Sequence, residues 1–158
     1  MQVDVVELPK MRAAALRHIG PYQQIGPVFD KLCGIAVVSG WFSLPEACTM
    51  LVTYDCPDTV PATELRSDAA VVVGADSVLP VDVDELVMPA RHYVRGIYIG
   101  PYSGLVDAWA AFNNDVRCAG YAVEGATALE MYVSDPRSCP VDELRTELYM
   151  PIMTAAGE

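Results

Sequence analysis

The chain lacks the features that several common functions require. No run approaches the 18 or so apolar residues that cross a bilayer. Only ten Lys and Arg stand against 21 Asp and Glu, so the net charge is −11 and the pI is near 4.4. Phosphate backbones and anionic surfaces are bound by clustered basic residues. We therefore predict no direct contact with nucleic acid or membrane, and an acidic field that favours cationic molecules or basic partners.

Residues for metal or redox chemistry are also scarce. His18 and His92 are the only histidines, and neither belongs to a cluster with metal-ligand spacing. The five cysteines form an odd set without a CxxC pair, which predicts free thiols in a reducing cytoplasm. No Gly-x-Ser-x-Gly elbow or phosphate-binding loop occurs, and the charged N-terminus is unlike a signal peptide. We expect a cytoplasmic protein without metal or cofactor.

The feature that is present is an internal repeat. Gly20–Tyr22 recurs 80 residues later as Gly100–Tyr102, and a Pro-x-x-Glu-Leu-Arg motif at Pro61 recurs at Pro140, one residue out of step. Each half, at about 80 residues, would be marginal alone because so small a unit buries little surface. We therefore expect residues 1–158 to form a single domain of two repeats, approximately 1–76 and 81–154, with a shared core.

Each repeat has the same order of expected elements. An apolar opening segment is followed by a second strand that Gly-Pro ends, then by a helix and two closing strands. This order predicts an α+β fold of duplicated β-α-β-β units, with mainly antiparallel sheet and two helices. The expected strands are 3–8, 12–19, 50–54 and 69–73, then 81–88, 92–99, 129–133 and 147–152. The helical spacing covers 25–32 and 105–116, and the helices are expected to end towards Gly34 or Gly40 and towards Gly120.

Two strands of the second repeat carry the candidate binding residues. Both contain Glu-x-Tyr, so alternation places Glu130 beside Tyr132 and Glu147 beside Tyr149. If the aliphatic residues pack on the helices, the opposite face carries both carboxylates and both phenols. Carboxylates ringed by aromatic side chains suit a lipophilic cation. The alternative is that both glutamates belong to an ordinary solvated sheet face.

The two copies differ at these positions. We match Glu130 with the apolar Met50, whereas Glu147 matches Asp68, so the second copy is the more acidic. Phe29 and Trp109 occupy equivalent helix positions, where an aromatic side chain serves either the core or a ligand platform.

Four motifs together resemble the GyrI-like, or effector-binding, domain family over nearly the whole chain. They are Gly20–Leu32, Pro61–Asp68, Leu129–Pro136 and Glu147–Ile152. The family includes the bacterial DNA gyrase inhibitory protein and the ligand-sensing domains of AraC- and MerR-type regulators. The resemblance implies a cleft between two β-α-β-β repeats, lined by acidic and aromatic residues that bind lipophilic cations. It implies ligand contacts at Glu130, Glu147, Tyr149, Tyr132, Trp109, Phe29, Pro21 and Pro101.

Three functions follow from the residues and the resemblance. The first is a stand-alone domain that binds amphipathic, cationic small molecules without turnover, since no segment remains for a helix-turn-helix. Glu147→Gln is then expected to weaken binding of a cationic dye. The second is gyrase modulation through the acidic surface. The third is hydrolysis of strained electrophilic toxins, with Glu130 or Glu147 as general base and a tyrosine or the other glutamate as acid.

Overall fold

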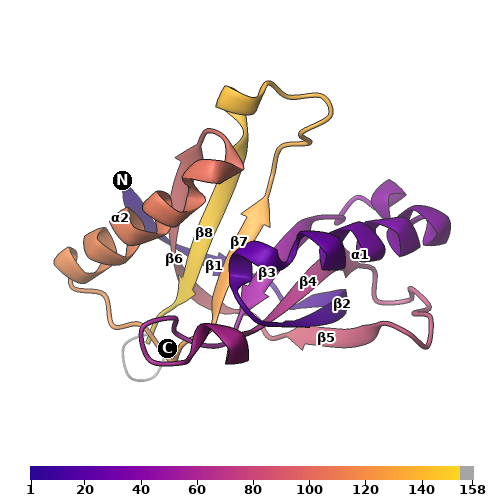
Figure 1. Ribbon diagram of the computed structural model, residues 1–158, viewed down its shortest axis with the longest axis horizontal. Helices are drawn as coiled ribbons and strands as arrows, with labels where there is room; N and C mark the ends of the chain where they lie inside the picture. Colours follow the sequence, from indigo (N-terminus) through magenta and orange to yellow (C-terminus); the bar gives the residue numbers. More distant parts are fainter. Residues whose placement is uncertain (154–158) are drawn as a thin grey trace. The chain divides into compact units, whose positions relative to one another are not determined.

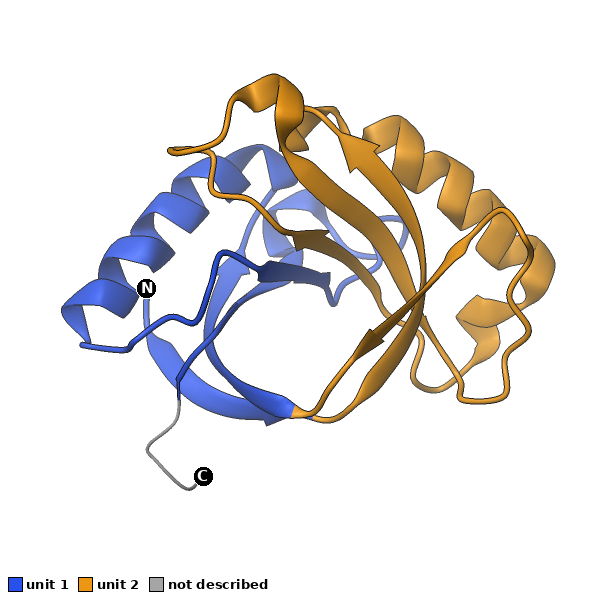
Figure 2. Cartoon of the chain, turned by 90° about the horizontal axis from the view of Figure 1, so that it is seen from below, with its two compact units in different colours: residues 1–8, 91–158 blue, residues 9–90 orange. Residues whose placement is uncertain are grey.

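The computed structural model describes residues 1–153, which form an α+β structure (Figure 1). The chain divides into two compact units (Figure 2). Unit 1 joins Met1–Leu8 to residues 91–153, and unit 2 is Pro9–Ala90. In each, antiparallel strands accompany one α-helix, which confirms the expected α+β class and order of elements. The cleft between the repeats and the single-domain organisation stay predictions.

Unit 2 is a four-stranded antiparallel sheet in the order β3-β4-β2-β5. Its helix α1 (Gly26–Ser39) contacts β4 and β2. Pro27 lies in the first turn of α1, and Gly40 ends it in the left-handed conformation at φ 75°. The strands are β2 (Met11–Ile19), β3 (Thr49–Thr53), β4 (Arg66–Val73) and β5 (Asp84–Met88); short 3-10 helices are η1 (Tyr22–Gln24), η2 (Trp41–Ser43) and η3 (Ala62–Glu64).

Unit 1 is built in the same way, in the order β1-β6-β8-β7. Its core forms where Phe112 and other residues of α2 (Leu105–Cys118) pack against Val94 and Leu148. Phe112 is 0% exposed on the helix side, and Leu129 and Tyr149 on the opposite side are 1% and 3% exposed, so both sides of the sheet are buried here. The strands are β1 (Val3–Leu8), β6 (Arg91–Ile99), β7 (Ala128–Tyr132) and β8 (Arg145–Pro151); the 3-10 helices are η4 (Tyr102–Gly104) and η5 (Val141–Glu143).

The first strand of each sequence repeat belongs to the sheet of the other repeat. β1 pairs with β6, and β5 pairs with β2. Prolines at positions 9 and 89 follow these strands, where a residue without an N–H ends the ladder. The compact units are therefore cut differently from the sequence repeats, and the Glu130 and Glu147 strands share a sheet with Val3–Leu8.

The spacing between equivalent strands is 79 residues at β3 and β7. Glu130 pairs with Leu148 as Leu51 pairs with Ala69. The structural equivalent of Glu130 is thus Leu51, and the match with Met50 was wrong. The buried helix positions Leu32 and Phe112 keep the spacing of 80, so one residue is lost between α2 and β7. Within the described chain no helix is both long and apolar enough to span a bilayer.

Candidate functional site

The register of β7 against β8 separates the two candidate glutamates. Glu130 lies directly opposite Leu148, whose side chain belongs to the core beneath α2. Directly opposed residues share a face, so Glu130 and Tyr132 lie on the helix side and Glu147 and Tyr149 on the other side. The expectation that both carboxylates share one face was wrong. Alternation was correct within each strand, but an offset of one residue between strands reverses the face.

Glu130 is a buried carboxylate surrounded by aromatic rings. It is 6% exposed. The indole Nε1 of Trp109, on α2, donates to Glu130 Oε1 at 2.7 Å, and the Tyr132 hydroxyl donates to Oε2. The ring of Tyr102 meets that of Tyr132 edge to face, with centroids 5.4 Å apart. We call Trp109, Glu130, Tyr132 and Tyr102 the Glu130 cluster.

Among the described residues, none of the contacts of Glu130 compensates its charge. Burial raises the pKa of its carboxyl, and the hydrogen bonds from Tyr132 and Trp109 oppose that shift only in part. Burial also raises the pKa of the Tyr132 phenol well above its usual value. Within residues 1–153, the contacts of Glu130 include no cationic side chain. An ionised carboxylate in this position favours a proton or a bound cation.

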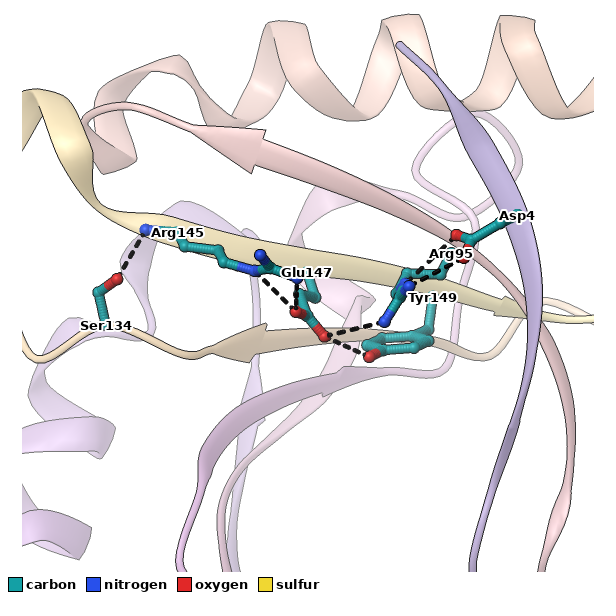
Figure 3. A network of polar contacts seen from close by, with 6 residues as sticks. All are labelled: Asp4, Arg95, Ser134, Arg145, Glu147 and Tyr149. Carbon is teal, nitrogen blue, oxygen red and sulfur yellow. Dashed lines mark hydrogen bonds and ion pairs between the residues drawn. The ribbon is translucent and has the colours of Figure 1, made fainter.

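Glu147 forms a different network on the other side of the sheet (Figure 3). Its carboxylate, 9% exposed, accepts from Arg145 Nε at 2.8 Å and from the Tyr149 hydroxyl at 2.5 Å. Arg95 lies 3.9 Å away and also binds Asp4 of β1 at 2.8 Å. Burial acts to raise the pKa of Glu147, but these hydrogen bonds and guanidinium charges outweigh it and the pKa is lowered. Two carboxylates and two guanidiniums leave this network, the Glu147 cluster, with no net charge.

Unit 2 keeps a comparable carboxylate at the position of Glu147. Asp68 accepts from Arg17 Nε at 2.7 Å and from the Tyr54 hydroxyl at 2.6 Å. It lies opposite Arg17 on β2, as Glu147 lies opposite Ile97 on β6. Both copies therefore hold a buried, Arg-paired carboxylate here, and the second copy adds a buried carboxylate, Glu130, where unit 2 has Leu51.

Tyr102 is the member of the Glu130 cluster that the sequence interpretation did not identify. In unit 2 the equivalent Tyr22 donates its hydroxyl to the Asp55 carbonyl at 2.5 Å. Within the described chain no partner is recorded for the Tyr102 hydroxyl, and Ser134 stands where unit 2 has Asp55. The sequence signal that could have identified Tyr102 was the repeated Gly-Pro-Tyr motif together with the replacement of Asp55 by Ser134 at the neighbouring turn.

The remaining predicted contacts lie elsewhere in the two units. Pro101 precedes Tyr102, and its carbonyl accepts a hydrogen bond from Tyr98. Pro21 and Phe29 belong to unit 2, and both are partly buried. Within residues 1–153, no cluster of three or more His, Cys, Asp or Glu side chains is arranged to hold a metal ion.

Comparisons with known proteins agree with this architecture. The model of the GyrI-like small molecule binding domain matches residues 1–153. A DNA gyrase inhibitor from Edwardsiella piscicida is 29% identical over 159 residues, covering 96% of this chain and 98% of that protein. The crystal structure of the EcmrR C-terminal domain superposes with a TM-score of 0.76 at 20% identity, covering 98% of each chain. The structure of SAV2435 bound to tetraphenylphosphonium gives 0.69 at 13% identity, covering 97% of this chain and 94% of that one.

The two solved structures share the fold of this chain, and the family model spans all of its described residues. Within residues 1–153 this chain has the duplicated strand-helix-strand-strand pattern and both Gly-Pro-Tyr turns. The chain belongs to the GyrI-like small-molecule-binding domain family.

Proposed function

We propose that this chain binds amphipathic organic cations at the Glu130 cluster. The observation that supports this is a buried carboxylate with aromatic neighbours and no cationic side chain among its described contacts. A ligand cation supplies the missing positive charge, and the ring faces of Trp109, Tyr132 and Tyr102 add cation–π attraction. The partly exposed Tyr102 is the natural contact for the apolar part of the ligand.

The charge distribution favours Glu130 over Glu147 as the site of cation recognition. The Glu147 carboxylate is shared between Tyr149 and two guanidiniums, so an incoming cation meets repulsion as well as attraction. We assign the Glu147 cluster the role of joining β1, β6 and β8. Pro101 of unit 1 remains a proposed contact for the apolar part of the ligand, and the contacts expected from Pro21 and Phe29 stay predictions.

The relatives support a ligand of this type. SAV2435 has this fold and was solved bound to tetraphenylphosphonium, an aromatic cation. The C-terminal domain of EcmrR has the same fold. These likenesses concern those proteins, and the assignment to this chain rests on the chemistry around Glu130.

The test compares two ions of the same shape and opposite charge. Tetraphenylphosphonium and tetraphenylborate are titrated calorimetrically into the wild type, Glu130→Gln and Glu147→Gln. The phosphonium has no hydrogen-bond donor, so its attraction to the carboxylate is Coulombic: about 1.5–2.8 kcal/mol for unit charges about 6–11 Å apart at an effective dielectric constant of about 20. Glu130→Gln should therefore weaken phosphonium binding about 10- to 100-fold. Glu147→Gln, an identical change on the other face, should alter it by less than about threefold.

The borate is expected to bind the wild type poorly and to gain from Glu130→Gln, because that change removes the repelling charge. Equal affinity of the wild type for both ions would refute the electrostatic basis of the proposal. Equal losses in the two variants would show that Glu130 is not the specific site.

A second candidate function is gyrase modulation. It is favoured by the curated relatives named DNA gyrase inhibitor, which match nearly the full length of this chain, and by the net charge of −11. An acidic surface that occupies a basic nucleic-acid path would bind more weakly as salt rises. The test is gyrase supercoiling activity titrated with this protein at 50 and 300 mM salt. If the protein does not inhibit supercoiling at 50 mM salt, gyrase modulation is eliminated as a function.

A further inference from the structure

We propose that Tyr98 is a positioning residue for the ligand site, because it fixes the turn that presents Tyr102. Tyr98 lies near the end of β6, immediately before the Gly100–Gly104 segment. Its consequence for ligand binding rests on the function proposed above, but its effect on the turn does not.

The phenol of Tyr98 fills the inside of this turn. Its hydroxyl donates to the Pro101 carbonyl at 2.7 Å. A Cβ added to Gly100 would lie 2.7 Å from that hydroxyl oxygen, and one added to Gly104 would lie closer still. Gly100 also has φ 151°, a conformation that side chains rarely adopt. The Gly100–Gly104 turn therefore packs closely around the Tyr98 hydroxyl. A side chain at Gly100 or Gly104 would collide with this hydroxyl, so both positions require glycine.

The ring of Tyr98 is also fixed by packing. It packs against the hydrophobic core beneath α2. Across the sheet it lies opposite Thr146, which in turn lies opposite Tyr132. Tyr98 and Tyr132 thus belong to one row on the helix side of the sheet, and the ring of Tyr102 contacts that of Tyr132 edge to face. Contacts run from Tyr98 through the turn to Tyr102, and from Tyr132 to the Glu130 carboxylate.

The other copy of the repeat holds its turn by a different contact. His18 replaces Tyr98 and reaches the Pro21 carbonyl at 2.9 Å, and its smaller ring leaves 3.6 Å to a Cβ on Gly20. Gln24 stands in place of Gly104, so that copy does not need the second glycine. Its Tyr22 is anchored directly by the Asp55 carbonyl.

Tyr102 has no such anchor recorded among the described residues. Its position against Tyr132 therefore depends on the turn, and the turn depends on Tyr98. The larger phenol and the extra glycine occur together in the copy that carries Glu130. This pairing is expected if Tyr98 supports the ligand site and is not merely a core residue.

The first measurement needs no ligand. In protein with ¹³C-labelled tyrosine rings, a nuclear Overhauser effect between Tyr102 and Tyr132 is expected in the wild type and lost in Tyr98→Phe. The matched variant His18→Phe, which removes the equivalent contact in unit 2, should leave it intact. Gly104→Ala, which displaces the Tyr98 hydroxyl, should also abolish it and provides a second perturbation. An unchanged signal in both Tyr98→Phe and Gly104→Ala overturns the inference.

The second measurement is a double-mutant cycle on tetraphenylphosphonium affinity. Tyr98→Phe should weaken binding about three- to tenfold, as for one lost neutral hydrogen bond, and should have no effect in a Tyr102→Ala background. An equal loss in both backgrounds shows that Tyr98 does not act through Tyr102 and overturns the positioning role. If the wild type fails to bind the phosphonium, the proposed function fails, and the ring signal alone decides whether Tyr98 sets the turn.

Discussion

The two buried glutamates of unit 1 should respond oppositely to the same substitution. Glu130→Gln and Glu147→Gln each replace a carboxylate by an amide of nearly equal size, on adjacent strands of one sheet. Changes in side-chain volume and in strand propensity are therefore the same in the two variants. The difference between their free energies of unfolding reports the electrostatic environment of each carboxylate. We expect Glu147→Gln to lower the free energy of unfolding at pH 7 and Glu130→Gln to leave it unchanged or raise it.

The contacts of Glu147 give the magnitude of its loss. Its carboxylate accepts from Arg145 and from the buried Tyr149, and hydrogen bonds to a charged group contribute about 1.5–3 kcal/mol. The Arg145 side chain is 40% exposed, so solvent screens its share. The neutral amide also leaves Arg145 and Arg95 with one carboxylate fewer. We expect a net loss of about 1.5–3 kcal/mol.

The contacts of Glu130 predict no such loss. Its partners are an indole N–H and a phenol, and the carbonyl oxygen of Gln accepts from Trp109 as the carboxylate does. The amide N–H₂ can donate to the Tyr132 oxygen, so the hydrogen bonds are retained. Removing a buried charge without a cationic partner relieves its desolvation cost. The expected effect is a gain of about 0–1 kcal/mol.

Thermal and urea unfolding across pH 3.5–8 measure both effects. For a chain of 158 residues, about 1 kcal/mol corresponds to about 2–4 °C, so the variants should differ in Tm by about 3–16 °C at pH 7. The pKa of Glu147 is lowered in the folded state, so its contribution is present above the ordinary pKa of 4.5 and is lost as pH falls through the folded value. The deficit of Glu147→Gln should fade in acid.

The contribution of Glu130 to stability depends on pH in the opposite direction. Its folded pKa is raised, so the stability it contributes is present below 4.5 and is lost as pH rises through the folded value. The advantage of Glu130→Gln should accordingly appear only as pH rises. Equal destabilisation by both variants, independent of pH, would refute the assignment of an unpaired charge to Glu130 and a paired one to Glu147.

Four further predictions test the site and its support. Gly96→Ala should cost about 1–3 kcal/mol in urea unfolding, because the new Cβ would lie 2.6 Å from Phe112 Cδ1 in the core. Tyr102→Ala should reduce tetraphenylphosphonium affinity about 3- to 30-fold, since this partly exposed ring offers a cation–π face, and should lower Tm by only about 1–6 °C through the lost contact with Tyr132. Phosphonium affinity should fall as pH is lowered through the raised pKa of Glu130, and titration calorimetry should find Glu130→Gln insensitive to pH in that range. If the Glu130–Tyr132 pair hydrolyses strained electrophiles, mass spectrometry of a cyclopropane-type substrate should show product with the wild type and none with Glu130→Gln; intact substrate with both favours binding without turnover.

The sequence alone predicted the elements well, because Pro and Gly mark their ends. The strand ending at Gly20 and the strand ending at Gly100 were placed to within about a residue at that end, and the apolar spacing located both helices. The exchange of Val3–Leu8 and Asp84–Met88 between the two sheets was not predicted. Each is a short apolar strand with no local feature that selects one partner over its equivalent in the other repeat.

The candidate site was predicted by composition but not by geometry. Alternation within a strand gives two faces, yet it does not say which face matches that of the neighbouring strand. That information lies in the backbone pairing of Glu130 with Leu148. Both faces of these strands are buried, so the apolar alternation did not select this register. The proposed role of Tyr102 was missed for a similar reason, since among the described residues it lacks the anchor that Tyr22 possesses.

Comparing the copies distinguishes charges that folding compensates from one that it does not. Asp68 and Glu147 occupy equivalent positions, and each is held by Arg and Tyr side chains, so both are accounted for as parts of the scaffold. Glu130 has no acidic counterpart, because Leu51 fills its position in the other copy with an apolar side chain that suits a buried sheet. Leu51 shows that the fold does not require a charge there, and the raised pKa of Glu130 shows that the charge is costly. A costly group that the scaffold does not need, placed among aromatic rings, is what ligand recognition requires and packing alone does not.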